Sequence, residues 1–469
     1  MTVEQRASVI INRNKGARRM TQKHHKISGT KLERIRTRAI KEKDTVFNNL
    51  LHAIDMDLLR ECFLSLSENK AEGIDGVTKD NYREKLNENL TDLHNRVRSN
   101  EYKPKPARIV EIPKADGTTR PLAIGCLEDK IVQEAIKRIL EAIYEPRFID
   151  SSHGFRPGKG CDTALVDVNK NLMKSNCEAV VDIDLRKFFD SIPHDKLVLI
   201  LEMKISQPSF IRLIIKILRT PKINQDGKII PNTQGVPQGS IVSPLLANIY
   251  LHYVLDCWFL AKVNNGELSH ATIVRYADDA IFTFDSIAKA KGFAEMLKTR
   301  LDRAGIELNE AKTKITPFGR NYAIFCERNG VKKPTFTFLG FTHYWKKRIG
   351  LFGPFWRPAV KGCSKRMNKK INLIAKYIRE NRHKPNLIEL VARTVRGVVG
   401  YFYVNGNAKQ VQSFNHAIQK LLKKWLNRRG QKGLLTWAEF IVKIKREGYP
   451  MSFKVKNLFY VMKPALRAV

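Results

Sequence analysis

The chain has 469 residues, which is enough for two to four domains with a sizeable buried core. Hydrophobic residues make up 43% of the chain, which argues against an intrinsically disordered protein. Its formal net charge of +38 repels itself unless an anionic partner neutralises it, so nucleic acid is the leading expectation.

The charge is concentrated at the two ends of the chain. Residues 1–40 hold 11 Lys/Arg against 2 Asp/Glu, and residues 342–469 hold 29 against 4. The seven cysteines include no C-x-x-C pair, so neither a zinc ribbon nor a redox motif is indicated. The sequence contains no apolar run of membrane-spanning length and no signal-peptide core, so we expect a cytoplasmic protein with no membrane partner.

The hydrophobic pattern predicts an α+β centre followed by a helical end. The first half is expected to contain a basic arm over residues 1–44, helices between 45 and 93, a strand over 107–112 with a hairpin turn at Asp116-Gly117, and an amphipathic helix over 127–145. The second half is expected to contain strands over 178–185 and 271–284, helices over 193–219, and basic helices near 360–380, 386–404 and 408–427.

Two of the strand-like runs carry carboxylates where apolar residues normally pack. One run holds Asp182 and Asp184, and the other holds Asp278 and Asp279. Burying carboxylates among Val, Ile and Phe is costly unless a cation neutralises them. An isolated Asp-Asp pair is more often an ordinary polar turn, but the second acidic strand weakens that interpretation. Hard oxygen ligands suit Mg²⁺, and two such ions would activate a 3′-hydroxyl and stabilise a leaving pyrophosphate.

The order of these motifs resembles that of reverse transcriptases over roughly residues 45–341. The matching segments are Ile112-Pro113-Lys114 and Arg120-Pro121-Leu122 in the fingers, residues 153–158, residues 184–190 as motif A, residues 233–240 and 243–248 as motif B, residues 276–279 as motif C, Lys312 in motif D, and residues 338–341 as the primer grip. The resemblance implies a right-hand polymerase fold, with fingers and palm built on an antiparallel sheet, followed by an α-helical thumb.

The resemblance also implies roles for individual residues. Asp184, Asp278 and Asp279 would be catalytic and hold two Mg²⁺ ions; the spacing within motif A favours Asp184, with Asp182 as second choice. The nucleotide-binding residues would be Lys114, Arg120, Phe189, Gln238, Gly239 and Lys312, and secondary positions would be Asp182, Tyr276, Phe338, Leu339 and Gly340. The bulky ring of Phe189 beneath the sugar would clash with a 2′-hydroxyl and so favour dNTPs.

Further segments resemble bacterial group II intron-encoded proteins. They are residues 73–77, 250–256, 275–279, 357–360, 396–402 and 425–429. The implied domains are a basic arm (1–44), fingers and palm (45–341), a thumb or maturase region (342–427) and a short basic DNA-binding-like tail (428–469) without an endonuclease. The implied compartment is the bacterial cytoplasm or nucleoid.

Three functions remain open at this point. The first is an RNA-directed DNA polymerase that also binds group II intron RNA to assist splicing and retrohoming, with an RNA template, a DNA primer, target DNA and dNTPs as partners. The second is a host-adapted relative acting in defence or DNA repair without splicing. The third is a non-enzymatic RNA-binding splicing factor, which retention of the three aspartates disfavours. The sequence does not indicate an oligomeric state.

Overall fold

A computed structural model describes residues 31–68, 70–113, 119–174, 177–224, 226–350, 353–428 and 434–458. Residues 1–30 of the expected basic arm, and the expected turn at Asp116-Gly117, lie outside these ranges. From residue 31 the chain is helical: α2 (Lys31–Lys41) lies along α6 and buries Ile35 and Ala39 in the core.

A four-stranded antiparallel sheet, here called the central sheet, has the strand order β6-β7-β3-β8. Its strands are β3 (Ala179–Ile183), β6 (Thr272–Tyr276), β7 (Asp279–Phe284) and β8 (Lys314–Pro317). Strand β3, from much earlier in the chain, lies between β7 and β8. The two acidic strand-like runs of the sequence are therefore neighbours in one sheet.

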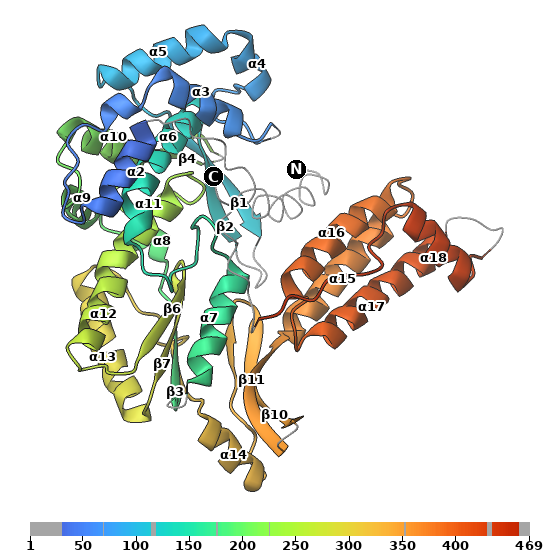
Figure 1. Cartoon of the computed structure of the whole chain (residues 1–469). Helices are drawn as coiled ribbons and strands as arrows, with labels where there is room; N and C mark the ends of the chain where they lie inside the picture. Colours follow the sequence, from blue (N-terminus) through green and yellow to red (C-terminus); the bar gives the residue numbers. More distant parts are fainter. Residues whose placement is uncertain are drawn as a thin grey trace.

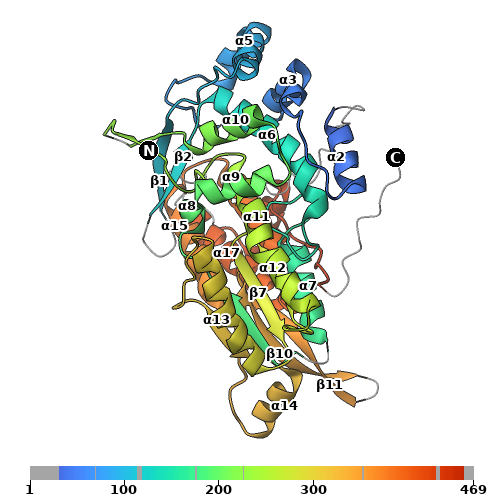
Figure 2. The same cartoon turned by 90° about the vertical axis from the view of Figure 1, so that its left-hand side faces the viewer.

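One face of the central sheet is covered by helices (Figure 2). These helices are α11 (Ser243–Leu251), the π-helical turn η3 (His252–Asp256), α12 (Cys257–Asn264) and α13 (Ile287–Arg303). Phe293 of α13 and Phe259 of α12 meet Phe282 of β7 at ring-centroid distances of 4.6 and 5.1 Å. Burial of large aromatic side chains of this kind dominates core energetics, so this face anchors the sheet.

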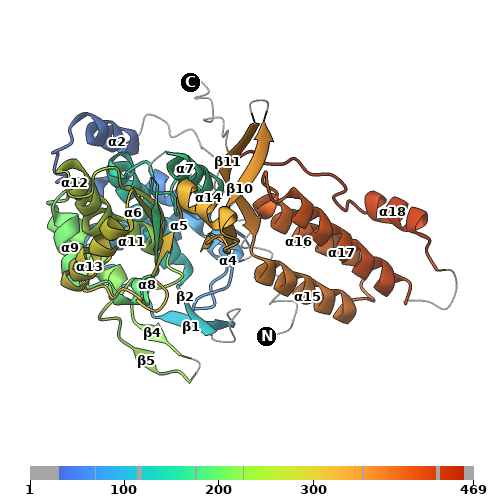
Figure 3. The same ribbon diagram turned by 90° about the horizontal axis from the view of Figure 1, so that it is seen from below.

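The opposite face of the central sheet packs against α7 (Cys161–Met173) and a hairpin beyond it (Figure 3). Val180, Val274 and Ile281 are buried there. Asp182 lies opposite Ile281 in the ladder, and Asp279 precedes Ile281 by two residues, so both aspartates belong to this face. An apolar face that ends in carboxylates is the pattern that the sequence indicated.

The upstream part of the chain forms a helical layer around the buried α6, at the upper left of Figure 1. Its helices are η1 (Leu51–Ala53), α3 (Met56–Ser65), α4 (Lys79–Glu84), α5 (Leu86–Arg98), α6 (Leu127–Tyr144), η2 (Glu145–Arg147), α8 (Phe188–Ser191), α9 (His194–Glu202) and α10 (Pro208–Leu218). A second sheet of order β2-β1-β4-β5 lies beside it, with strands β1 (Ala107–Pro113), β2 (Thr119–Ile124), β4 (Lys222–Ile223) and β5 (Ile229–Ile230).

A third sheet, of order β11-β10-β9, connects the central sheet to a C-terminal helical bundle (Figures 1 and 3). The elements of this part are α14 (Arg320–Arg328), β9 (Phe336–Phe338), β10 (Phe341–Gly350), β11 (Gly353–Gly362), α15 (Ser364–Glu380), α16 (Leu387–Phe402), α17 (Ala408–Leu426) and α18 (Trp437–Arg446). Among the described residues, no helix is both long and apolar enough to cross a membrane.

The α+β class and the helical C-terminal region expected from the sequence are confirmed. Three basic helices were expected near 360–380, 386–404 and 408–427, and α15, α16 and α17 lie there. Residues 341–362 differ, because they form the long β10–β11 hairpin before the helices begin. Helix α18 was not predicted, although Thr436 and Glu439 form a capping box at its start.

Asp129 of α6 provides a test of the packing in the helical layer. This carboxyl group is buried, accepts a hydrogen bond from the Tyr102 hydroxyl, and has a pKa that burial raises to about 6. Because the folded-state pKa is raised, its stabilising contribution is complete below the unfolded pKa and is lost as pH rises through about 6. We expect Asp129→Asn to raise the free energy of unfolding at pH 8 by about 1–3 kcal/mol and to change it little at pH 4.

Denaturant unfolding of both proteins at the two pH values measures this difference. The exposed Asp44 offers a matched control, since Asp44→Asn makes the same chemical change without burial. An Asp129→Asn protein that is no more stable than wild type at pH 8 would contradict the assignment.

Candidate active site

The acidic pair lies at a tight hairpin turn between β6 and β7. Tyr276 and Asp279 pair across the hairpin, so Ala277 and Asp278 form its two-residue turn. Ala277 has a φ of 57°, a left-handed conformation that residues with a Cβ rarely adopt. A strained turn persists only when its surroundings hold it in place, and two neighbouring segments do so here.

The first of these is a buried network centred on Arg275. Its guanidinium makes a bidentate ion pair with Asp256 (Nε–Oδ1 2.8 Å, Nη2–Oδ2 2.6 Å), and both side chains are fully buried. Nη1 donates to the side-chain oxygen of Asn248 at 2.9 Å and to the backbone oxygen of Ala277 at 3.0 Å. The guanidinium therefore connects the strained turn directly to α11 and η3, which cover one face of the central sheet.

The second is the segment around Gly154. The backbone amide of His153 donates to the carbonyl of Arg275 at 2.8 Å, and the Asn248 amide donates to the carbonyl of Gly154 at 2.7 Å. A Cβ on Gly154 would lie 2.3 Å from the backbone nitrogen of Ala277. Only glycine permits this close approach, so the block over residues 153–158 packs against the back of the turn.

Asp184 follows the end of β3 and lies within electrostatic reach of both aspartates of the turn. Desolvation, followed by repulsion from Asp278 and Asp184, raises the pKa of Asp279 to about 6. Desolvation and the Asp184 charge also raise the pKa of Asp278. Asp279 remains exposed and Asp278 half-buried, so both are open to a ligand. The structure thus brings together the three carboxylates that the motifs singled out.

Asp182 lies on β3 two residues before Asp184, and both are half-buried. Desolvation, with repulsion from Asp279 and Asp184, raises the pKa of Asp182 to about 7. The charge of Asp184 raises the pKa of both turn aspartates, whereas Asp182 is among the named causes for neither of them and is itself raised by Asp279. This asymmetry favours Asp184 over Asp182 as the third member of the acidic set.

Two side chains after α13 bind Asp184. The Asn309 amide donates to its Oδ2 at 2.8 Å, and the Lys312 ammonium lies 3.2 Å from the same oxygen. Lys312 is thereby placed at the acidic site, as its motif suggested. Asn309 was not predicted as a site residue, and neither was Arg366 of α15, whose charge opposes the rise in the pKa of Asp279.

The glycine-rich loop of residues 233–240 lies across α8 and β2. The Val236 amide donates to the carbonyl of Phe189 at 2.7 Å, and the Gln238 side chain donates to Asp190 at 2.9 Å. Gly239 has a φ of 115°, and a Cβ there would lie 2.4 Å from the backbone oxygen of Ala123. Phe189, Gln238 and Gly239 are therefore brought together where this loop meets α8 and β2.

The two adjacent phenylalanines of α8 differ in their surroundings. Phe188 is buried in the core, whereas Phe189 packs against that core but remains half-exposed. From β2, Arg120 is exposed, and its charge opposes the rise in the pKa of Asp278, so it lies within electrostatic reach of the acidic site. Lys114 lies outside the described residues.

Residues 338–341 form the tight turn from β9 to β10. Leu339 and Gly340 have φ values of 49° and 82°, and Phe338 is buried. The Tyr401 hydroxyl of α16 donates to the carbonyl of Leu339 at 2.7 Å, and Arg366 lies beside Gly340. The turn is thus fixed between the central sheet and the C-terminal bundle. Tyr276 is half-buried and packs against the apolar cluster that contains Phe338 and Phe341.

The acidic set matches the preferences of Mg²⁺. Its donors are carboxylate oxygens, and desolvation together with repulsion between carboxylates raises the pKa of Asp278 and Asp279. In the part of the chain that the structure describes, no group of three or more His, Cys, Asp or Glu side chains converges enough to hold a metal ion by itself. Mg²⁺ usually keeps several waters and binds substrate phosphates as well as carboxylates, so an ion at this site would need such further ligands.

An antiparallel sheet bearing clustered aspartates, backed by helices and flanked by a second sheet and a helical bundle, defines a polymerase of the right-hand type. The model of the family "Reverse transcriptase (RNA-dependent DNA polymerase)" matches residues 112–343. The chain belongs to the reverse transcriptase family. Reverse transcriptases generally use divalent metal ions, which agrees with the chemistry of the acidic set.

Curated relatives refine this placement. Protein YkfC of Escherichia coli is 37% identical over 273 residues, 52% of this chain and 71% of that protein. The group II intron-encoded protein LtrA of Lactococcus lactis is 34% identical over 223 residues, 47% of this chain and 37% of LtrA. The putative COX1/OXI3 intron 1 protein of Saccharomyces cerevisiae is 34% identical over 268 residues, 56% of this chain and 31% of that protein. The chain spans about a third of the latter two, and the resemblance to group II intron-encoded proteins is confirmed.

Proposed function

We propose that this protein is the RNA-directed DNA polymerase of a group II intron, and that it also binds the intron RNA to assist splicing and retrohoming. The observation that carries the proposal is the grouping of Asp184, Asp278 and Asp279 at the edge of the central sheet. The proposed substrates are dNTPs and a DNA primer paired with an RNA template, and the proposed further partner is target DNA.

In this proposal the three aspartates hold two Mg²⁺ ions. When bound, these ions activate the primer 3′-hydroxyl and stabilise the leaving pyrophosphate. Arg120 and Lys114 bind the triphosphate, and the charge of Arg120 beside Asp278 favours this arrangement. Lys312, now paired with Asp184, is placed to deliver a proton to the departing pyrophosphate. Leu339 and Gly340 position the primer strand, and Gln238 and Gly239 line the nucleotide site.

We propose that the C-terminal bundle is the thumb and maturase region. Helix α15 and strands β1 and β2 lie on the same side of the molecule in Figures 2 and 3. Exposed cationic side chains are spaced along α15; they are Lys365, Arg366, Lys369, Lys376 and Arg379. Lys and Arg contacts to phosphates bind a duplex without reading its sequence. The proposed domain limits stay as expected from the sequence: 1–44, 45–341, 342–427 and 428–469.

The direct test is extension of a labelled DNA primer on an RNA template with dNTPs and Mg²⁺. We expect processive DNA synthesis that chelation of the metal stops. Flanking sequence around the gene that encodes a folded group II intron RNA would support the maturase role, and its absence would favour a host-adapted enzyme. A protein that binds RNA but extends no primer would overturn the polymerase assignment.

The half-exposed Phe189 provides a prediction about sugar selection. We expect Phe189→Ala to increase rNTP relative to dNTP incorporation by about tenfold or more, because removal of the ring makes room for a 2′-hydroxyl. The ratio of kcat/KM for the two nucleotides is the measurement. Phe188→Leu is the matched control: it should lower stability without altering this ratio, since Phe188 faces the core. Equal selectivity in Phe189→Ala and wild type would rule out the gate.

A further inference from the structure

Helix α14 presents two exposed aromatic rings on one side. Tyr322 is 40% exposed and Phe325 is 55% exposed, and their rings stack with centroids 6.1 Å apart and planes inclined by 22°. Ala323 and Cys326 are buried and attach the helix to the core, which leaves the two rings in solvent. Scattered exposed hydrophobic residues need no explanation, but adjoining ones are candidates for an interaction surface. We call Tyr322 and Phe325 the aromatic stripe.

The aromatic stripe lies at the end of the central sheet away from the acidic site. Helix α14 follows β8, and Pro317 at the end of β8 pairs with Ala179 at the start of β3. Asp184 follows the other end of β3, which has five residues and so spans roughly 15 Å. Figures 1 and 2 both show α14 below the sheet. A ligand on the stripe would therefore not occupy the polymerase site.

The charges around the aromatic stripe favour an anionic ligand. Residues 319–333 hold four Lys/Arg against one Asp/Glu. The acidic residue, Glu327, forms ion pairs with two lysines, at 2.5 and 3.3 Å. Arg328 ends α14 three residues after Phe325, Lys332 follows in the next loop, and both are exposed. A ligand that carries phosphates would thus meet cations beside the rings.

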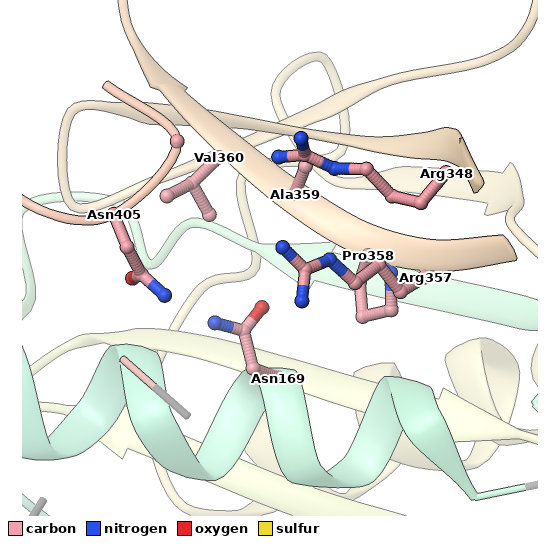
Figure 4. A pocket seen from close by; sticks show the side chains of 8 residues that line it. Asn169, Arg348, Arg357, Pro358, Ala359, Val360 and Asn405 are labelled. Carbon is pink, nitrogen blue, oxygen red and sulfur yellow. The ribbon is translucent and has the colours of Figure 1, made fainter. Parts of the chain in front are cut away.

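The two faces of the β10–β11 hairpin differ in the space that they offer. Trp345 belongs to the face on which α14 packs, where the guanidinium carbon of Arg320 lies 6.0 Å from its ring centroid. The other face is turned toward α7, where Asn169 and Arg348 line a pocket with room for little more than a water molecule (Figure 4). A nucleotide base could not enter that pocket, whereas the rings on α14 are open to solvent.

The size of the aromatic stripe favours a small planar group over a protein. Helix α14 has nine residues and is about 13 Å long. Its exposed side is therefore far smaller than the roughly 800 Å² that each partner contributes to a typical protein interface. Two adjoining rings match unpaired bases instead, since every base has a face that can stack on an aromatic ring. The neighbouring cations match the phosphates of the same strand.

We propose that Tyr322 and Phe325 stack on unpaired bases of a single RNA strand, and that Arg328 and Lys332 contact its phosphates. The choice of RNA rests on the proposed function, in which RNA is a partner of this protein. The stripe itself is separate from the acidic site, so α14 provides a second RNA contact at the opposite end of the central sheet.

The test measures binding of fluorescent oligouridylate to the full chain while an unlabelled template–primer duplex occupies the polymerase site. Tyr322→Leu/Phe325→Leu keeps apolar side chains but removes both rings, and we expect it to weaken binding about tenfold or more. Tyr322→Phe/Phe325→Tyr keeps both rings and should bind as the wild type does. An unchanged affinity in the leucine variant would overturn the proposal.

The phosphate contacts are tested by the salt dependence of the same binding. Each phosphate contact contributes about 0.7 to the slope of log K against log salt for a single strand. We expect Arg328→Gln/Lys332→Gln to reduce the magnitude of that slope by about 1.4. Lys85→Gln/Arg98→Gln removes the same charge from exposed positions at the other end of the molecule and should leave the slope unchanged. Equal losses in both variants would contradict the contacts, because the effect would then be one of net charge.

A further arm distinguishes RNA from a protein partner. Thermal unfolding verifies that each variant folds, and sedimentation reports self-association. If the wild type self-associates and Tyr322→Ala/Phe325→Ala is monomeric with an unchanged affinity for oligouridylate, the stripe joins two copies of the chain and the proposal is wrong. A wild type that binds oligouridylate through the stripe but extends no primer would contradict the proposed function and support this inference.

Discussion

Replacing Asp279 with Asn is expected to reduce primer extension by a factor of roughly 10³ or more, because a neutral amide would replace a carboxylate that we propose as a metal ligand, and metal catalysis supplies several kcal/mol of transition-state stabilisation. The fold should tolerate this change. Desolvation, with repulsion from Asp278 and Asp184, already raises the pKa of Asp279 to about 6, so the metal-free protein accommodates the neutral form more easily than a free carboxyl group would. Asn reproduces that neutral form at every pH.

Three measurements make the expectation specific. Single-turnover extension reports the chemical step, binding of the template–primer reports the interface, and thermal unfolding without Mg²⁺ reports the fold. Only the first should fall in Asp279→Asn. The exposed Asp150 supplies a control, since Asp150→Asn makes the same substitution far from the turn in sequence. Extension at the wild-type rate in Asp279→Asn would disprove the metal-ligand role.

Local pattern was sufficient to predict many helices and three strands of the central sheet, but not β8. The apolar spacing along 364–380 and 408–426 is helical in itself, and short β-rich runs mark β3, β6 and β7. The β10–β11 hairpin was harder to predict because its stability comes from pairing between strands and packing on α7. Helix α18 could have been found from the spacing of Thr436 and Glu439 alone.

The residues of the acidic site were also predictable only where local sequence was enough. Asp278 and Asp279 are adjacent in sequence, and their placement at a hairpin turn follows from the need to share a ligand. The partners of Asp184 are different, because Asn309 and Lys312 are more than 120 residues away and reach it only through the folded chain. Arg366 comes from α15, a helix of the C-terminal bundle. A charge count finds the basic region that contains it but cannot select the one arginine beside Asp279.

Substitution of Arg275, which forms an ion pair with Asp256 behind the turn, is expected to have the second large effect. Arg275→Met leaves the fully buried carboxylate of Asp256 without its guanidinium partner, which costs about 3–5 kcal/mol of stability. The change also removes the donor that binds the carbonyl of Ala277, so the strained turn loses an anchor. Arg275→Lys should be nearly as harmful, since an ammonium cannot reproduce the bidentate geometry with Asp256 and still reach Asn248 and Ala277.

A double variant separates the two consequences. In Arg275→Met/Asp256→Leu both charges are replaced by apolar groups, and such replacements of a buried pair are often neutral or stabilising. We therefore expect denaturant unfolding to show most of the lost stability restored. Primer extension should stay reduced by about 10²-fold, because misplacement of a catalytic group by about 1 Å costs that much. We also expect the Mg²⁺ concentration for half-maximal rate to rise, since the aspartates of the turn are less well positioned. Recovery of activity together with stability would show that Arg275 acts only in folding; loss of activity in a stable protein would show that it positions the turn.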